Sequence, residues 1–275
     1  MVAWSVIYAS TVIMLLCLTV FLGGLVFIVR RFKGTAKAFL LGAAGFFVSS
    51  VILRSPLISL SAMLPGYEGF LKNHYIIYIF IIALLAGLLE AVGRLGILQL
   101  GLKGSPTYEQ GIAAGFGHGA LEAVVVLCPV YFNNIVFSLM VNQGVYEDIM
   151  KSAGIPVRQM DIIKTAIVGL RPEDVYLGGL ERVLIIICQI GFTMIMVQYI
   201  RSIRMLPGLV ICAGTQTMFN FAAGVLQGLS TPYMGNAADK VTGSILVNGF
   251  LALAAAGSFL FIRRLKKQEW AKKAQ

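Results

Sequence analysis

Seven long apolar runs constrain this chain more than any other feature of its sequence. An α-helix needs roughly 20 residues to cross a hydrocarbon core of about 30 Å, and backbone groups in lipid must be satisfied within the segment. The runs are Trp4–Val29, Ala36–Leu53, Tyr75–Leu100, Gly111–Val130, Val175–Ile200, Pro207–Leu226 and Val241–Ile262. We therefore expect an all-α bundle of about seven spans, forming a single integral membrane domain over residues 1–275.

Charged residues are sparse and lie mainly at the ends of the apolar runs. They make up 12% of the chain, against about 25% in a typical soluble domain. The net charge of +10 would suit nucleic acid, but its placement beside apolar runs is typical of the positive-inside pattern of membrane proteins. We expect lipid, and no nucleic acid, as the partner of this charge.

The distribution of Lys and Arg predicts the orientation. Thirteen basic residues flank one side of the predicted spans: Arg30, Arg31, Lys33, Lys37, Lys103, Arg201, Arg204, Arg263, Arg264, Lys266, Lys267, Lys272 and Lys273. The other side has seven: Arg54, Lys72, Lys151, Arg158, Lys164, Arg171 and Lys240. The richer side faces the cytoplasm. We predict an outer N-terminus, a basic cytoplasmic tail at 263–275, and a bacterial plasma membrane as the location.

One sizeable segment, residues 142–174, lies outside the apolar runs. Its apolar residues recur at helical spacing among charges, which predicts a helix on the membrane surface. Pro172, followed by two acidic residues, predicts the start of the next helix. An extra half-span near Tyr131–Met140 is the alternative to the count of seven.

Polar pairs interrupt three of the apolar runs at a spacing of one helical turn. A carboxylate at the bilayer centre costs about 2.5–3.5 kcal/mol on insertion scales, so such residues need a reason. The pairs are Glu90 with Arg94, His118 with Glu122, and Gln216 with Asn220. Each has a structural reading too: a salt bridge that locks helix packing, a hydrogen-bonded packing histidine, and interhelical amide contacts.

Two further features accompany these pairs. Gly111, Gly115 and Gly119 form a stripe of small residues beside His118, which predicts close packing of that helix. Glu181 and Arg182 lie two turns into the fifth run, where adjacent side chains diverge. We expect Glu181 to point into the bundle and Arg182 to reach lipid headgroups.

These side chains match the needs of hydrolysis by an activated water. A carboxylate or imidazole can take a proton from water, and an amide such as Asn220 can donate to the oxyanion of a tetrahedral intermediate. A zinc site built from His118, Glu122 and Glu90 is the weaker alternative, since catalytic zinc usually takes three protein ligands with histidine prominent. We expect no metal and no other cofactor.

The chain also resembles a known family in these same residues. Its E-x-x-x-R element at Glu90–Arg94, the G-x-G-H-G-x-x-E element at Gly115–Glu122 and the later Leu180–Arg182 resemble the YhfC family of intramembrane proteases. That family is grouped with the glutamic-type CAAX-protease and bacteriocin-processing superfamily. The resemblance runs across most of the chain.

The resemblance implies peptide-bond hydrolysis within the membrane, without a metal. Glu90 and His118 would hold the water, Arg94 would orient the glutamate, and Asn220 would assist the oxyanion. The chain departs from the superfamily at two places. Leu89 stands where a second glutamate is frequent, and Gln216 stands where the later pair usually begins with histidine. Glu122 is the candidate replacement for the missing carboxylate.

The sequence leaves two other functions open. Intramembrane carboxylates and a histidine also serve as proton relays in transporters, although no inverted repeat is visible here. Gln216, which cannot carry a proton, suits a non-catalytic membrane scaffold or immunity-type protein. A membrane peptide or protein substrate is our first expectation.

Overall fold

The computed structural model describes residues 1–103 and 106–273, with side chains described up to Glu269. The last two residues of the predicted tail, 274–275, lie outside the described residues. Seven helices are long and apolar enough to cross a membrane, and the described residues contain no strand. This confirms the predicted all-α class and the predicted number of spans.

The helices follow the chain in a simple order. The spanning elements are α1 Trp4–Arg31, α2 Ala36–Phe46 with its continuations, α5 Tyr75–Gly96, α6 Tyr108–Gln143, α9 Pro172–Arg201, α10 Met205–Gly228 and α11 Lys240–Lys273. The remaining helices are α3 Ser55–Ser61, α4 Tyr67–Asn73, α7 Tyr146–Ser152 and α8 Val157–Val168, with a 3-10 turn at Pro232–Met234. π-helical segments at Phe47–Arg54 and Ile97–Gly101 extend α2 and α5.

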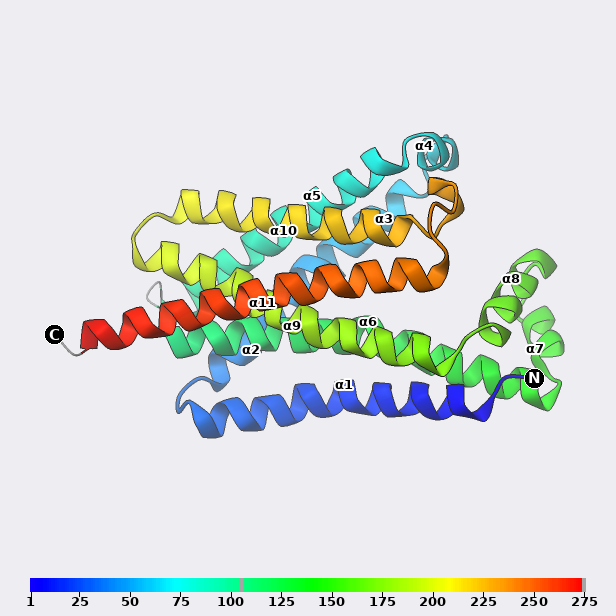
Figure 1. The fold of residues 1–275 in the computed structure, drawn as a ribbon, viewed down its shortest axis with the longest axis horizontal. Coiled ribbons are helices and arrows are strands. Elements are labelled where there is room, and N and C mark those ends of the chain that lie inside the picture. Colours follow the sequence, from blue (N-terminus) through cyan, green and yellow to red (C-terminus); the bar gives the residue numbers. More distant parts are fainter. Residues whose placement is uncertain (104–105, 274–275) are drawn as a thin grey trace.

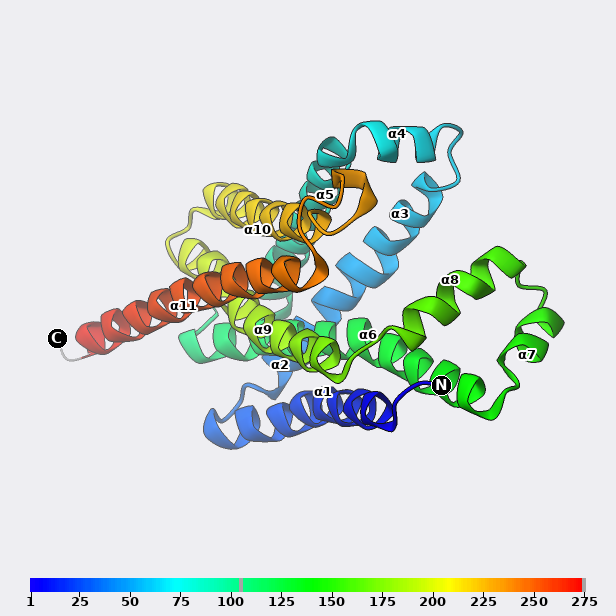
Figure 2. The same ribbon diagram turned by 45° about the vertical axis from the view of Figure 1, so that its right-hand side comes forward.

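The spanning helices run along the long axis of the molecule, and the two termini lie at opposite ends (Figure 1). α6 and α9 pack on each other at the centre. α1 and α2 contact α6, whereas α10 and α11 contact α9, and α5 packs chiefly on α10 (Figure 2). α5, α6, α9 and α10 each carry one of the predicted polar features, so this arrangement places those features on neighbouring helices.

Three helices extend well beyond their predicted ends. α11 continues through most of the predicted basic tail to Lys273. α6 continues past Pro129 to Gln143, so Tyr131–Met140 lengthens the fourth span and forms no separate half-span. Proline is tolerated in membrane helices because neighbouring groups satisfy the freed backbone. The second span continues through Arg54 to Ser61, which places Arg54 within a helix rather than in a flanking loop.

The connection between α6 and α9 folds into the short helices α7 and α8, near the end that holds the N-terminus (Figure 2). Tyr146 Oη donates to the Met160 carbonyl oxygen at 3.0 Å, and Lys164 Nζ donates to Glu147 Oε1 at 2.8 Å. This hydrogen bond lowers the pKa of Glu147 and raises the pKa of Lys164. α9 begins at Pro172, as predicted. The contact of α8 with the bilayer surface stays a prediction.

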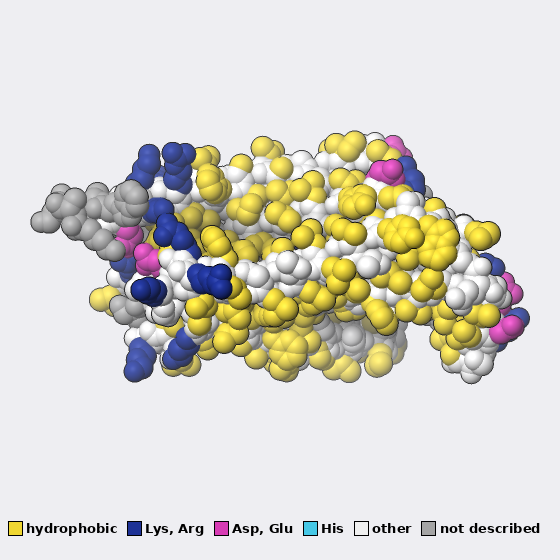
Figure 3. All heavy atoms as spheres, turned by 90° about the horizontal axis from the view of Figure 1, so that it is seen from below, with side chains coloured by type: hydrophobic (Ala, Val, Ile, Leu, Met, Phe, Trp, Pro, Cys, Tyr) yellow, Lys and Arg dark blue, Asp and Glu magenta, His cyan; other side chains and the backbone are white. Residues whose placement is uncertain are grey.

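Apolar and charged side chains occupy separate zones of the surface. Hydrophobic side chains cover the middle of the bundle, and Lys and Arg gather at the end that holds the C-terminus (Figure 3). An apolar belt between polar ends is the pattern expected of a protein that spans a bilayer.

The predicted glycine stripe on α6 faces α9. A Cβ on Gly115 would lie 2.6 Å from Ile190 Cα, and one on Gly119 would lie 2.9 Å from Ile186 Cα. One turn earlier, a Cβ on Gly111 would lie 2.7 Å from Met194 Sδ. The two central backbones therefore approach too closely for larger residues, as the sequence predicted.

A second contact of this kind joins α2 to the opposite side of α6. A Cβ on Gly42 would overlap the Ala114 carbonyl group, and a Cβ on Gly117 would overlap that of Phe39. Glycines thus fix α6 against helices on two sides, and His118 lies between two of these contacts.

We predict that Gly42→Ala destabilises the protein by about 1–3 kcal/mol, because the added methyl group must push α2 away from a backbone carbonyl. The control is Gly214→Ala in α10, where an added Cβ meets no atom of the described structure within 4 Å, and we expect a change within about 0.5 kcal/mol. Equilibrium unfolding in mixed SDS micelles measures both. Equal effects would contradict the close α2–α6 contact.

Candidate active site

Glu90, on α5, is buried at the centre of the bundle, with 3% of its side chain exposed. Its Oε1 accepts hydrogen bonds from Arg54 Nη1 at 2.8 Å and from Ser50 Oγ at 3.1 Å. Its Oε2 accepts a hydrogen bond from Gln216 Nε2 and lies 3.1 Å from His118 Nε2. One carboxylate therefore gathers partners from three other spans. We call Glu90 and these partners, together with Arg94, the Glu90 cluster.

Arg94, one turn after Glu90, has a fully buried side chain. Its Nη2 lies 3.5 Å from Glu90 Oε2 and donates to Gln189 Oε1. Its Nη1 donates to Gln216 Oε1 at 2.5 Å, and its Nε donates to Thr193 Oγ1 at 3.3 Å. The planar guanidinium group thus ties α5 to α9 and α10 while it holds the carboxylate.

His118, on α6, places Nε2 3.1 Å from both Glu90 Oε2 and Arg94 Nη2. One ring nitrogen cannot donate to the carboxylate and accept from the guanidinium at once, so the tautomer selects one of these bonds. Nδ1 is buried and has no partner in the described part of the chain. The ring packs edge-on against Phe46, with centroids 5.3 Å apart. In either tautomer, His118 keeps one ring nitrogen for a further ligand.

Glu122 joins the Glu90 cluster through a bridge. Gln189 Nε2 donates to Glu122 Oε2 at 2.6 Å, while Gln189 Oε1 accepts from Arg94. Arg182 Nη1 lies 3.6 Å from Glu122 Oε1. The expectation that Arg182 reaches headgroups is therefore wrong, because its side chain pairs with a carboxylate inside the bundle.

Two predicted site residues stand apart from Glu90. Asn220, half-buried one turn beyond Gln216, makes no hydrogen bond to the Glu90 cluster in the described structure. Glu181 Oε1 accepts a hydrogen bond from Asn248 Nδ2 of α11 at 3.3 Å, in a separate contact. The roles of Asn220 and Glu181 stay predictions.

Four members of this network are not evident from the sequence pattern. They are Ser50 and Arg54 on the second span, and Gln189 and Thr193 on the fifth. Each of these two pairs has the same four-residue spacing as the pairs that were noticed. This spacing is a signal that could identify them, but Arg54 stands at the end of its apolar run like a flanking residue, and the other three are uncharged.

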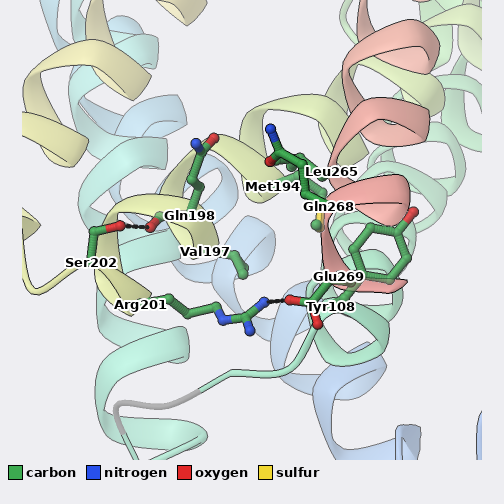
Figure 4. Close-up of a pocket in the computed structure, with 9 residues that line it drawn as sticks. All are labelled: Tyr108, Met194, Val197, Gln198, Arg201, Ser202, Leu265, Gln268 and Glu269. Atoms are coloured by element: carbon green, nitrogen blue, oxygen red, sulfur yellow. Dashed lines mark hydrogen bonds and ion pairs between the residues drawn. The ribbon is translucent and has the colours of Figure 1, made fainter. Parts of the chain in front are cut away.

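A separate hollow opens at the basic end of the molecule. It measures about 220 Å³ and lies between α9, α11 and the start of α6, beside Tyr108 and Gln198 (Figure 4). An ion pair between Arg201 Nη1 and Glu269 Oε1 crosses it. No residue of the Glu90 cluster lines this hollow.

Comparison with known proteins identifies the family. A sequence-family model described as YhfC intramembrane metalloprotease matches residues 13–236. The chain belongs to the YhfC family. A relative described as uncharacterized membrane protein YhfC, from Bacillus subtilis (strain 168), is 26% identical over 188 residues, which cover 66% of this chain and 70% of the relative. No solved structure matches. The resemblance noted at Glu90–Arg94 and Gly115–Glu122 is confirmed at the level of this family.

The family description implies a metal ion. The question is whether the side chains of the site could bind one. Among the described residues, no group of three His, Cys, Asp or Glu side chains is placed to share a metal. Glu90 and His118 both contact the permanently charged guanidinium of Arg94, which would repel a divalent cation. Catalytic zinc usually takes three protein ligands. The donor set at Glu90 and His118 therefore does not fit a metal centre.

We predict that Arg94→Met lowers the free energy of unfolding by about 3–5 kcal/mol, since it removes the fully buried one of the two cations beside Glu90 and leaves the partners of Arg94 unpaired. The matched control is Arg201→Met, which removes the cation of a partly exposed pair and should cost at most about 1 kcal/mol. SDS unfolding followed by circular dichroism measures both. A small loss for Arg94→Met would show that Glu90 does not depend on this partner.

Proposed function

We propose that the chain is an intramembrane peptidase of glutamic type, in which Glu90 and His118 activate a water molecule. The observation that carries the proposal is the 3.1 Å approach of His118 Nε2 to Glu90 Oε2, between two spans and away from bulk water. The family description, intramembrane metalloprotease, supports the protease activity but not the glutamic type. Membership of the CAAX-protease superfamily is part of the proposal.

The hydrogen bonds favour distinct roles for the two groups. Both oxygens of Glu90 already accept hydrogen bonds, whereas His118 Nδ1 has no described partner. We therefore assign proton acceptance from water to His118, and stabilisation of the resulting imidazolium to Glu90. The hydroxide attacks the scissile carbonyl carbon and forms a tetrahedral intermediate. The C–N bond then breaks, the imidazolium proton passes to the leaving amine, and the water oxygen stays in the new carboxylate.

The other candidate residues support this pair. Gln216 bonds both Glu90 and Arg94, so it holds the carboxylate without carrying a proton. Glu122 acts on Arg94 through Gln189, as a positioning residue. The resemblance implies oxyanion donation by Asn220, a role that its position outside the Glu90 cluster does not by itself support. Glu181 steadies α9 against α11 through Asn248. Because the donor set does not fit a metal centre, the proposal is independent of metal.

We predict that Glu90→Gln and His118→Ala each lower the rate of peptide cleavage by about 10²–10⁴-fold, the usual contribution of a positioned acid or base. The probe is a pool of synthetic single-span peptides reconstituted with the protein in liposomes, with products read by mass spectrometry. The controls are Glu68→Gln and His74→Ala, which change the same residue types at exposed positions near α4. They should cleave as the wild type does.

Two outcomes would overturn the proposal. Wild-type rates in folded Glu90→Gln and His118→Ala proteins would remove the catalytic pair. A wild-type protein that cleaves no peptide in the pool, but carries solute across liposomes in response to a pH gradient, would favour a proton-coupled transporter.

We also propose that the whole chain is one membrane domain with its N-terminus outside a bacterial plasma membrane and its basic tail in the cytoplasm. The accumulation of Lys and Arg at one end of the apolar belt supports this orientation (Figure 3). In a variant without the four native cysteines, a membrane-impermeant maleimide added to whole cells should label Lys164→Cys on α8. It should label Lys267→Cys on α11 only after lysis. The reverse pattern would invert the topology.

A further inference from the structure

The Glu90 cluster contains one more positive charge than its carboxylate neutralises. Glu90 contacts two guanidinium groups, those of Arg54 and Arg94. The next carboxylate, Glu122, pairs with Arg182, and in the described structure it forms no ion pair with Arg54. Arg54 and Arg94 therefore share the single negative charge of Glu90 in the interior of the bundle. The positive charge that remains can bind a further anionic or strongly polar group.

The two arginines differ in how many of their donors are in use. Arg94 is fully buried and donates to four side chains. Arg54 donates from Nη1 to Glu90, and no other hydrogen bond of its guanidinium is found within the described residues. Arginine carries five N–H donors in a fixed fork. Arg54 can therefore hold Glu90 and bind a second acceptor at the same time.

Arg54 is also the charged residue of the Glu90 cluster that is most accessible from outside the bundle. Its side chain is 23% exposed, whereas those of Glu90, Arg94 and His118 are 3% exposed or less. Leu53 and Leu57, beside it on the second span, are exposed apolar residues of the kind that faces lipid. A peptide segment moving sideways in the bilayer would therefore meet Arg54 before it met Glu90.

The local backbone explains why this arginine points inward. Pro56 lacks an N–H group and would clash with the carbonyl four residues earlier in a regular α-helix. The chain instead widens into the π-helical segment Phe47–Arg54, in which the Ser55 N–H bonds the Ser50 carbonyl oxygen. This wider turn directs Ser50 and Arg54 together at Glu90 Oε1. π-Helical turns within helices are frequent at functional sites.

We propose that Arg54 is a catalytic residue that binds the scissile carbonyl oxygen and stabilises the oxyanion of the tetrahedral intermediate. This inference rests on the proposed function. When hydroxide attacks the carbonyl carbon, the C=O π electrons move to oxygen, and the negative charge forms against the free N–H groups of Arg54. When the intermediate collapses, the electrons return as the C–N bond breaks. Arg54 keeps its protons throughout.

Arg54 suits this role better than Asn220 does. An oxyanion is stabilised most by preorganised donors aimed at the developing charge in a water-poor site. Arg54 is cationic and fixed on Glu90 at 2.8 Å, whereas Asn220 is neutral and makes no described hydrogen bond to the Glu90 cluster. His118, which activates the water, and Arg54, which stabilises the oxyanion, then both contact the carboxylate of Glu90.

The test compares Arg54→Gln and Arg54→Lys with Ser50→Ala in the liposome assay, using the single-span peptide that the wild type cleaves best. Removal of one oxyanion donor costs about 10²–10³ in kcat, so we expect that loss for Arg54→Gln with little change in KM. Arg54→Lys keeps the charge but loses the fork, and it should fall between Arg54→Gln and wild type. It also tests the role if Arg54→Gln does not fold.

Ser50→Ala is the matched control, because Ser50 donates to the same oxygen of Glu90 but is fully buried. Loss of this one hydrogen bond to the carboxylate should lower kcat by about tenfold. As a second readout, the same peptide with a phosphonate in place of the scissile bond should bind wild type more tightly than the substrate does. Arg54→Gln should lose that preference.

Three outcomes would overturn the role of Arg54 without touching the proposed function. The first is a change confined to KM, which would make Arg54 a ground-state contact. The second is an equal loss of kcat in Ser50→Ala, which would make Arg54 a support for Glu90. The third is an unchanged preference of Arg54→Gln for the phosphonate. Failure of the proposed function is seen separately, as full activity in Glu90→Gln and His118→Ala.

Discussion

The burial of the Glu90 carboxylate inside an apolar bundle is the constraint on which the rest of the structure depends. An unpaired charge there would be too costly to keep, so α5, α9 and α10 are joined through Arg94 and its partners. Such a cluster is a poor source of stability, since well-packed apolar residues of similar volume do as well or better. The presence of the cluster is better explained by what the carboxylate and its neighbours do chemically.

The packing of α6 places a histidine beside that carboxylate. Glycines on two sides of this helix permit backbone contact with α2 and α9, and the close approach carries His118 to within 3.1 Å of Glu90. The second span supplies the remaining element, because the π-helical turn before Pro56 brings Arg54 onto the same carboxylate. Small residues and one proline thus fix distances between groups that lie on separate helices.

Much of this arrangement could be predicted from the sequence. Membrane helices are recognised by the length of their apolar runs, and polar residues within them are rare enough to stand out. The seven spans, the glycine stripe and the presence of polar pairs that include Glu90, Arg94 and Gln216 follow from those two rules. The role of Arg54 could not be predicted, because a basic residue near the end of an apolar run looks like a residue of the flanking loop. Only the π-helical turn shows that Arg54 belongs to the helix and faces Glu90. Gln189 could not be predicted as a site residue, because an uncharged amide in an apolar run is only a weak sign of a functional role. The separation of Asn220 from the Glu90 cluster depends on helix rotation, which spacing does not determine.

If Glu90 and His118 hydrolyse peptides with guanidinium groups, and not a metal ion, as their electrostatic partners, the active protein needs no bound metal. The metal content of the purified, cleavage-active protein can be measured by inductively coupled plasma mass spectrometry. We expect far less than one transition-metal ion per chain, with cleavage retained at that content. One tightly bound ion per active chain, lost together with activity in His118→Ala, would rule out the metal-independent mechanism and support the metalloprotease description of the family.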